Sequence, residues 1–178
     1  MDYKKIKLVV LDVDGTLTDG GVYYDSHGNE MKRFDVKDGL GILVARKAGL
    51  EFAIITGRAS PMVERRAKEL GIKYLLQGVQ KKYPALTELA RECGLALDEI
   101  GYIGDDLNDL QCMEAVGFRA CPADAAKAVK DICNYVASVP GGRGAVRESL
   151  EHLLTQQNKW RTASEVLYTT KKKSSTFP

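Results

Sequence analysis

The fold follows from the stretch Lys7-Leu8-Val9-Val10-Leu11-Asp12-Val13-Asp14-Gly15-Thr16-Leu17-Thr18, in which an apolar run ends abruptly in carboxylates, a glycine and hydroxyls. The run lacks glycine, proline and polar alternation, which predicts a strand buried on both faces, as in a parallel sheet. Asp12 then lies at the strand's carboxyl end, the edge at which open α/β sheets bind ligands, and Asp14 shares its face. Two carboxylates held together favour a cation. Mg²⁺ is the expected one, because it suits one or two carboxylates beside a phosphate.

Other interpretations of this stretch explain less of it. An Asp-Gly turn in a hairpin accounts for Asp14 and Gly15 but not for the apolar run before them. A calcium loop of the EF-hand type that starts at Asp12 needs glycine at its sixth place and glutamate at its twelfth, where this chain has Leu17 and Tyr23. The calcium loop is therefore excluded. A polar strand end without any chemistry stays open on this stretch alone.

The composition is that of an ordinary globular protein. The chain has 178 residues, 44% of them hydrophobic and 28% charged, which fits one domain with a sizeable core. Lys and Arg number 26 against 24 Asp and Glu, so no general field favours nucleic acid or a membrane as partner. The N-terminus shows no apolar signal region and no apolar run reaches about 18 residues, so we expect a cytoplasmic enzyme. A zinc site is not expected, because the cysteines form no Cys-x-x-Cys pair. We expect all four cysteines to be reduced core residues: Cys93, Cys112, Cys121 and Cys133.

Strand-like apolar runs alternate with helical patterns along most of the chain. Asp38 is expected to cap a helix over residues 39–47, with an inner face formed by Leu40, Leu43 and Val44. Ser60 and Pro61 begin the next helix, with an inner face formed by Val63, Ala67 and Leu70. Further strands are expected over residues 52–55, 74–76, 100–103, 118–121 and 135–137. The alternation predicts an α/β fold with a Rossmann-like parallel sheet and helices on both faces.

Two segments depart from this alternation. Val22-Tyr23-Tyr24 and the run from Met31 to Val36 flank a Gly/Asn turn, which predicts a β-hairpin over about residues 18–36 beside the site. The run Pro140-Gly141-Gly142-Arg143-Gly144 is expected to be a flexible or ligand-adaptable loop before a terminal helix whose inner face continues to Trp160. Residues 1–168 are expected to form one domain and the Lys/Ser/Thr-rich residues 169–178 a disordered basic tail.

Four strand ends or adjoining loops carry polar side chains. They are Asp12-x-Asp14-x-Thr16, Thr56-Gly57-Arg58, Lys82, and Asp105-Asp106 with Asp109. This set suits phosphoryl transfer to an aspartate, because one carboxylate attacks phosphorus while a second protonates the leaving alcohol and later takes a proton from water. A hydroxyl, backbone amides and a lysine hold the phosphoryl oxygens, and Mg²⁺ shields the nucleophile from the substrate's negative charge.

With these four motifs in order, the residues from about Lys7 to Val116 resemble the haloacid dehalogenase superfamily of phosphotransferases. The resemblance implies that Asp12 is the nucleophile and a Mg²⁺ ligand. It implies that Asp14 is the general acid and base and gives its backbone carbonyl to the metal. The other roles that it implies are phosphoryl binding by Thr56 and Lys82, metal binding by Asp105 and support by Asp109.

The segments between the motifs leave no room for a cap domain, as in the capless (C0) subclass. Over roughly residues 4–154 the chain resembles the 3-deoxy-D-manno-octulosonate 8-phosphate (KDO 8-phosphate) phosphatase family, through Asp12 to Gly20, the hairpin, Asp35 to Ile42, Thr56-Gly57-Arg58 and Gly141-Gly142-Arg143-Gly144. The resemblance implies hydrolysis of that sugar phosphate in lipopolysaccharide biosynthesis, and a homotetramer in which the hairpin joins subunits and a neighbouring subunit covers the site. The substrate-binding residues that it implies are Asp14, Asp35, Val36, Lys37, Asp38, Gly39, Gly57, Arg58, Arg66 and Lys82.

Two alternatives to this function remain. One is a phosphatase of a nine-carbon sugar acid 9-phosphate, of the sialic acid or deaminated sialic acid (KDN) type. The other is a non-catalytic binding subunit with the same fold. The role of Arg66 also stays open, because its neighbours Glu64 and Arg65 fit a solvated, charged helix face as well as a substrate-binding one.

Overall fold

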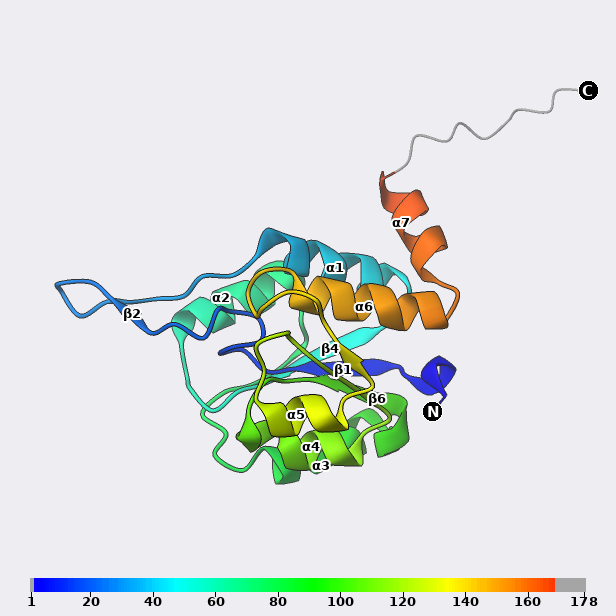
Figure 1. Cartoon of the computed structure of the whole chain (residues 1–178), viewed down its shortest axis with the longest axis horizontal. Helices are drawn as coiled ribbons and strands as arrows, with labels where there is room; N and C mark the ends of the chain where they lie inside the picture. The colour runs from blue at the N-terminus through cyan, green and yellow to red at the C-terminus, as the bar shows by residue number, and fades with distance from the viewer. Residues whose placement is uncertain (1, 169–178) are drawn as a thin grey trace, which may run out of the picture.

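The computed structural model describes residues 2–168, which build a six-stranded sheet between two layers of helices (Figure 1). Every neighbouring pair of strands is parallel, which confirms the predicted α/β fold. In spatial order the strands are β5 (Tyr74–Leu76), β4 (Glu51–Ile55), β1 (Leu8–Leu11), β6 (Ile100–Ile103), β7 (Phe118–Cys121) and β8 (Tyr135–Val136).

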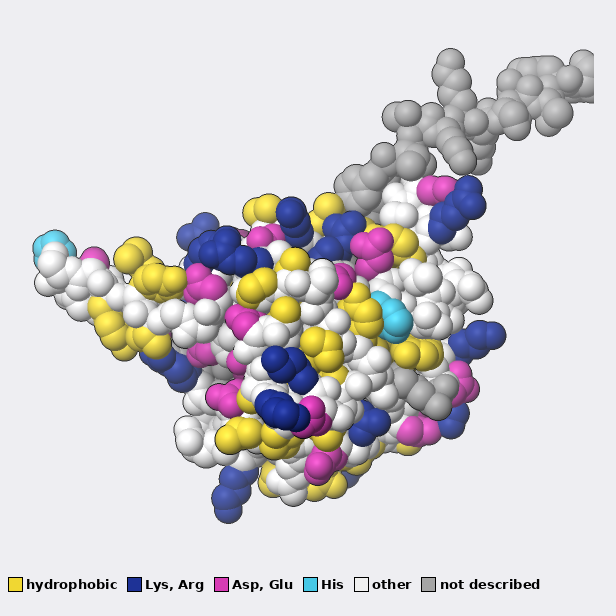
Figure 2. All heavy atoms as spheres, in the orientation of Figure 1, with side chains coloured by type: hydrophobic (Ala, Val, Ile, Leu, Met, Phe, Trp, Pro, Cys, Tyr) yellow, Lys and Arg dark blue, Asp and Glu magenta, His cyan; other side chains and the backbone are white. Residues whose placement is uncertain are grey.

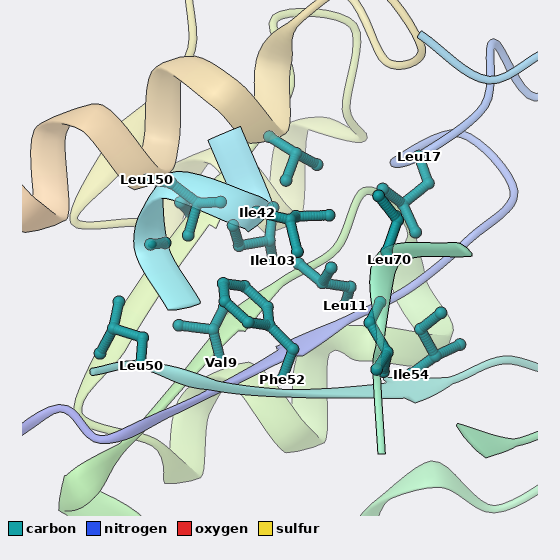
Figure 3. Close-up of a cluster of buried hydrophobic side chains, with 14 of the residues drawn as sticks. Val9, Leu11, Leu17, Ile42, Leu50, Phe52, Ile54, Leu70, Ile103 and Leu150 are labelled. Atoms are coloured by element: carbon teal, nitrogen blue, oxygen red, sulfur yellow. The ribbon is translucent and has the colours of Figure 1, made fainter. Parts of the chain in front are cut away.

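Both faces of the sheet are covered, because alternate side chains of the central strands enter two separate apolar clusters. Val9 and Leu11 of β1 enter the cluster shown in Figure 3, together with Ile42 and Leu150 from helices on that face. Leu8 and Val10 enter the second cluster on the opposite face. The first layer consists of α1 (Val36–Lys47), α2 (Pro61–Leu70) and α6 (Ala145–Gln156). The second consists of α3 (Lys82–Cys93), α4 (Leu110–Ala115) and α5 (Lys127–Ile132). Short 3-10 helices are η1 (Tyr3–Lys5), η2 (Leu97–Glu99) and η3 (Leu107–Asp109).

The strand order reverses beside β1. The chain adds β4 and β5 on one side of β1 and then β6, β7 and β8 on the other. At the carboxyl edge Leu11 is in register with Ile54 on one side and Ile103 on the other, so the loops after three strands open at one place. A crevice at such a reversal is where open α/β sheets bind their ligands.

The start of α1 differs from the prediction. The N-cap is Asp35, whose side chain accepts a hydrogen bond from the Lys37 amide at 2.7 Å, and not Asp38. Asp38 lies inside the first turn, where its carboxylate accepts hydrogen bonds from the amides of Gly144 (3.3 Å) and Arg147 (2.8 Å). The predicted inner face was also wrong in part, because Leu43 is 38% exposed whereas Val44 and the unpredicted Ile42 and Ala45 are buried. Gly41 permits the close approach of α1 to α6 there, because a Cβ atom on it would lie 2.8 Å from the Arg147 side chain.

An antiparallel pair, β2 (Tyr23–Tyr24) and β3 (Glu30–Met31), forms a hairpin that projects from the body of the protein (Figure 1). Both strands are shorter than the segments expected from the sequence. Asp25 organises the turn, since its Oδ1 accepts hydrogen bonds from the amides of His27 and Asn29, both at 2.8 Å. The space-filling view shows hydrophobic side chains along the projecting hairpin (Figure 2).

The loop from Pro140 to Gly144 is not a free loop. Its Gly142 amide donates to the Thr16 carbonyl at 3.2 Å, and its Gly141 amide donates to Asp124 at 3.0 Å. A Cβ atom on Gly141 would lie 1.8 Å from the Gly15 carbonyl oxygen, so the two backbones pack directly on each other. The loop thereby attaches α6 to the loop that carries Asp12 and Asp14.

The terminal helix is interrupted, contrary to the expectation of one face reaching Trp160. Helix α6 ends at Gln156, and the chain turns at Asn158, which has a φ of 59°. Helix α7 (Trp160–Tyr168) then begins in a new direction. The Arg147 guanidinium packs 4.8 Å from the centre of the Trp160 ring. The predicted tail, residues 169–178, lies outside the described residues. Within residues 2–168 no helix has the length and apolar character needed to span a membrane.

The Asp38 contacts predict a stability effect. Replacing Asp38 with Ala leaves the Gly144 and Arg147 amides without their carboxylate acceptor, so we expect the free energy of unfolding to fall by about 1–3 kcal/mol. Chemical denaturation measures this loss. Asp131→Ala, which removes an exposed partner of Lys127, is the control and should cost less than about 0.5 kcal/mol.

Asp38 also predicts a pH dependence. Burial raises its pKa to about 6 in spite of the hydrogen bonds from the Arg147 and Gly144 amides. Because the folded protein then binds the proton more tightly than the unfolded chain, the contribution of Asp38 to stability falls as pH rises from about 4 to about 6. The stability of wild type minus that of Asp38→Asn should therefore decrease across this window. A constant difference would contradict the assignment.

Candidate active site

The site lies at the carboxyl edge of the sheet, between β1 and β6. Asp12 follows β1 directly, and its amide donates to the Ile103 carbonyl at 3.0 Å, so the parallel pairing continues one residue beyond β1 to Asp12. Asp105 follows β6 by two residues and accepts a hydrogen bond from the Thr16 hydroxyl at 2.8 Å. Gly15, with a φ of 91°, lies between them; a Cβ atom there would be 2.0 Å from an Asp105 oxygen. Only glycine permits this approach.

Lys82, at the start of α3, is a buried cation of the site. Its ammonium lies 2.8 Å from Asp12 Oδ1 and 2.8 Å from Asp109 Oδ1, and all three side chains are nearly inaccessible to solvent. Burial disfavours the charged form of Lys82, but the charges of Asp12 and Asp109 outweigh it and raise the pKa of the ammonium. A buried ion pair of this kind is costly to break, so Lys82 stays charged beside Asp12.

Asp109 accepts hydrogen bonds from several other groups of the site. Its Oδ1 accepts from Lys82 and from the Tyr102 hydroxyl, both at 2.8 Å, and its Oδ2 accepts from the Asp105 amide at 3.2 Å. These bonds connect α3, β6 and the Asp105 loop through one buried carboxylate. The supporting role that the family resemblance implied for Asp109 agrees with this geometry, and Tyr102 is a partner that the sequence reasoning did not identify.

The acidic groups exceed the positive charge available to them. Burial and the charge of Asp109 raise the pKa of Asp12 to about 6 even with Lys82 beside it. Burial also raises the pKa of Asp105 to about 7 against the Thr16 hydrogen bond, and the charges of Asp12 and Asp109 add to the effect. Oxygens of these three carboxylates lie within 4.8 Å of one another. Because Asp109 is already bonded at both oxygens, Asp12 and Asp105 are the side chains that fit a hard divalent cation such as Mg²⁺.

A cavity of about 220 Å³ opens above these carboxylates. It brings together most of the motif residues predicted from sequence, and adds Asn108 to them; its lining is Asp12, Asp14, Thr56, Gly57, Arg58, Asp105, Asp106 and Asn108. Thr56 is held at the end of β4 by two backbone hydrogen bonds, from its amide to Leu76 and from the Val79 amide to its carbonyl, both at 3.0 Å. Thr56 and Arg58 thus line the same cavity as Asp12 and Asp105, and a hydroxyl and a guanidinium are groups that suit the binding of a phosphoryl group.

The hairpin contributes two charged residues that the sequence reasoning missed. Lys32 hydrogen-bonds Asp14 Oδ1 and lies 3.7 Å from Glu30, whose Oε1 accepts a hydrogen bond from Arg58 at 2.6 Å. The result is a row of alternating charges, Asp14, Lys32, Glu30 and Arg58, of which the first and the last line the cavity. The available signal was the alternation of Glu30, Met31 and Lys32, which places the two charged residues on one face of the returning strand.

The other predicted substrate residues lie apart from this cavity. Asp35 caps α1, Lys37 is exposed on that helix, and Asp38 is buried against α6. Gly39 lies against the Arg66 side chain. A neighbouring cavity of about 320 Å³ is lined by Lys32, Phe34, Val36, Met62, Arg65, Arg66 and Glu69. Within it Arg66 donates to the Asp35 carbonyl at 3.2 Å and packs on the Phe34 ring, so Arg66 is not simply a solvated charge.

Known proteins share this sequence over most of its length. A model of haloacid dehalogenase-like hydrolases matches residues 75–146. The 3-deoxy-D-manno-octulosonate 8-phosphate phosphatase of Escherichia coli (strain K12) is 44% identical over 88% of this chain and 83% of that protein. The chain belongs to the 3-deoxy-D-manno-octulosonate 8-phosphate phosphatase family of haloacid dehalogenase-like hydrolases. The family member of Haemophilus influenzae is 41% identical over 88% of this chain and 87% of that protein.

Solved structures of family members have the same fold. The phosphatase from Moraxella catarrhalis, crystallised with magnesium, phosphate and KDO, superposes with a TM-score of 0.90 at 42% identity, over 94% of this chain and 96% of that one. The cobalt-bound form from Haemophilus influenzae gives a TM-score of 0.88 at 38% identity, over 94% of this chain and all of that one (100%). The family resemblance derived from the four motifs is thus confirmed.

We predict the effect of removing the negative charge of the buried Asp12 side chain. In Asp12→Asn the amide cannot attack phosphorus, so we expect kcat to fall more than about a hundredfold, which is roughly 3 kcal/mol of barrier. Phosphate release measures kcat, and thermal denaturation checks the fold. The control is Asp98→Asn at the opposite edge of the sheet, where the carboxylate pairs with exposed Lys5. Activity in Asp12→Asn above a hundredth of the wild-type value would remove Asp12 from the nucleophile role.

Proposed function

We propose that this protein is a Mg²⁺-dependent phosphatase that hydrolyses 3-deoxy-D-manno-octulosonate 8-phosphate to the free sugar acid and phosphate, in lipopolysaccharide biosynthesis. The observation that carries the proposal is the meeting of Asp12, Lys82 and Asp105 at the sheet edge where β1 and β6 part. The substrate proposed here is the one for which the relatives are named, and the metal is the one present in the Moraxella structure. Asp12 and Asp105 would hold Mg²⁺, together with the backbone carbonyl of Asp14.

The chemistry assigned to the residues has two displacements. Asp12 attacks phosphorus and forms an aspartyl phosphate, while Asp14 gives its proton to the leaving sugar oxygen. Asp14 then takes a proton from water, whose oxygen attacks phosphorus and frees Asp12. Lys82 and Thr56 bind the phosphoryl oxygens while the negative charge on these oxygens changes during each displacement. Asp12 and Asp105 would hold Mg²⁺, which when bound would offset the negative charge of the Asp12 carboxylate and of the phosphate, two groups that otherwise repel.

A panel of sugar phosphates tests this function. The purified protein is given octulosonate 8-phosphate, a nine-carbon sugar acid 9-phosphate and a hexose 6-phosphate, each with Mg²⁺ and with a chelator. We expect the highest kcat/KM on the eight-carbon acid and no turnover without Mg²⁺. A preference for the nine-carbon acid would support the first alternative function. Absence of phosphate release from every substrate would support the non-catalytic one.

Selectivity is assigned to the arginines near the two cavities. A sugar acid carries a carboxylate as well as a phosphate, and Arg58 and Arg66 are cations on the two adjoining cavities. Replacing either with Ala should raise KM for octulosonate 8-phosphate about tenfold or more, because a charge-assisted hydrogen bond contributes roughly 1.5–3 kcal/mol. Lys68→Ala, on the exposed face of α2, is the control. Equal losses on a small phosphate without a carboxylate would mean that these arginines serve the phosphate or the fold.

We also propose that the protein is a homotetramer assembled through its hairpin. The support is apolar surface on a projecting element: Val22, Tyr23, Tyr24 and Met31 are 53%, 43%, 63% and 54% exposed. Tyr24→Glu should dissociate the tetramer, measured as mass by light scattering at micromolar concentration. Val136→Glu, on the opposite edge strand β8, should not. A wild-type monomer would contradict the proposal, and dissociation by Val136→Glu alone would move the interface to β8.

Two further proposals concern the chain as a whole. Residues 1–168 are assigned to a single phosphatase domain, supported by the continuous sheet and by the contact of the loop before α6 with the loop after Asp12. A cytoplasmic location is supported by the free thiols of all four cysteines, since reducing compartments keep cysteines unpaired.

A further inference from the structure

Lys32 is a buried charged side chain bonded to Asp14, and neither the motifs nor the proposed reaction provides a role for it. It follows β3 in the hairpin, and its side chain is only 3% exposed although Met31 beside it is 54% exposed. A buried ammonium is stable only when it is paired and hydrogen-bonded. Lys32 has two such partners, the Asp14 carboxylate through Oδ1 and Glu30 at 3.7 Å.

Glu30 fixes the position of this ammonium. Its carboxylate is 19% exposed and is itself bound to Arg58 at 2.6 Å, on the wall of the cavity formed after β4. The hairpin base is therefore attached to the motif loops at two points, Asp14 and Arg58. If Lys32 moved away from Asp14, its buried ammonium would lose its hydrogen bond and keep only the longer contact with Glu30.

The contact with Lys32 also distinguishes the two oxygens of Asp14. A lysine ammonium only donates hydrogen bonds, so the oxygen that it contacts, Oδ1, is the acceptor. The proton that Asp14 passes to a leaving group must then be on Oδ2. The Asp14 side chain is 28% exposed on a loop, and without Lys32 its carboxyl group can rotate. A general acid must lie within hydrogen-bond reach of the leaving oxygen, and a displacement of about 1 Å can cost about a hundredfold in rate.

We propose that Lys32 is a positioning residue for proton transfer: it holds Asp14 by Oδ1 so that Oδ2 faces the cavity beside Asp12 and Thr56. The proposal rests on the phosphatase function proposed above. In the first displacement the bond from phosphorus to the sugar oxygen breaks and the Oδ2 proton moves to that oxygen. Lys32 keeps its own protons throughout. The hairpin thus contributes to catalysis within its own subunit.

The leaving group separates this role from a purely structural one. An alkyl sugar oxygen needs an acid to leave, whereas p-nitrophenolate leaves without one. Lys32→Met should lower kcat on octulosonate 8-phosphate about tenfold or more, with less than about a threefold change in KM and in kcat on p-nitrophenyl phosphate. Lys32→Gln, which keeps an N–H donor, should retain more of the kcat than Lys32→Met. Lys5→Met, which loses an exposed pair at the other edge of the sheet, is the control.

A double-mutant cycle with Asp14→Asn tests whether Lys32 acts through Asp14. When Asp14 no longer carries a proton to transfer, adding Lys32→Met should change kcat on octulosonate 8-phosphate by less than about twofold. A full additional loss in that background would overturn the proposal. So would a raised KM for the sugar acid with kcat unchanged, because Lys32 also lines the cavity with Arg66 and would then bind the sugar acid directly.

Other outcomes are equally decisive. Equal losses of kcat on the alkyl and aryl phosphates would give Lys32 a structural role only. Thermal denaturation monitors folding, and if Lys32→Met does not fold, Lys32→Gln alone decides by the same comparison. A wild-type protein that releases phosphate from neither substrate overturns the proposed function and this inference together. An active wild type with an unaffected Lys32→Met overturns this inference alone.

Discussion

The ion pair between Lys82 and two carboxylates is the interaction on which the rest of the site depends. It joins the end of β1, through Asp12, to α3 and, through Asp109, to β6 and the loop after it. These elements lie on both sides of the point where the strand order reverses. A parallel sheet brings strand ends together but does not set their side chains to within an ångström. The buried ammonium does this, because any displacement would leave a charge without a partner in a region from which water is excluded.

The same arrangement explains why the site favours a cation and a phosphate together. The Lys82 ammonium contacts only Asp12 and Asp109 of the three carboxylates. Burial, together with the charges of neighbouring carboxylates, raises the pKa of Asp12 to about 6 and that of Asp105 to about 7. A divalent cation relieves this excess of negative charge and adds to the positive charge of Arg58, which lines the same cavity. A phosphoryl group supplies the complementary charge. The geometry is therefore adapted to the pair of ligands rather than to either one.

The sequence was informative where local chemistry determines structure. Ser60, Pro61 and Gly71 bound α2 as predicted, and buried apolar runs gave the six strands with small errors at their ends. Reasoning failed where partners are distant in sequence. Asp38 resembles a cap, yet Asp35 is the cap because the Asp38 carboxylate instead binds amides that start α6, more than a hundred residues away. Lys32 and Glu30 were missed for the same reason, since their importance comes from Asp14 and Arg58 and not from their neighbours.

The packing of Gly141 on Gly15 has a consequence for the order in which the protein forms during synthesis. Asp12 and the turn that follows it leave the ribosome among the first residues, but the loop that packs on the backbone of this turn, from Pro140 to Gly144, emerges about 130 residues later. Contacts between segments so far apart in sequence form late, because the chain between them must first be ordered. The emerging chain can complete β1 and α1 without completing its active site. The turn after Asp12 is thus packed only when this loop is in place, whereas every residue of the Lys82 ion pair has emerged well before it.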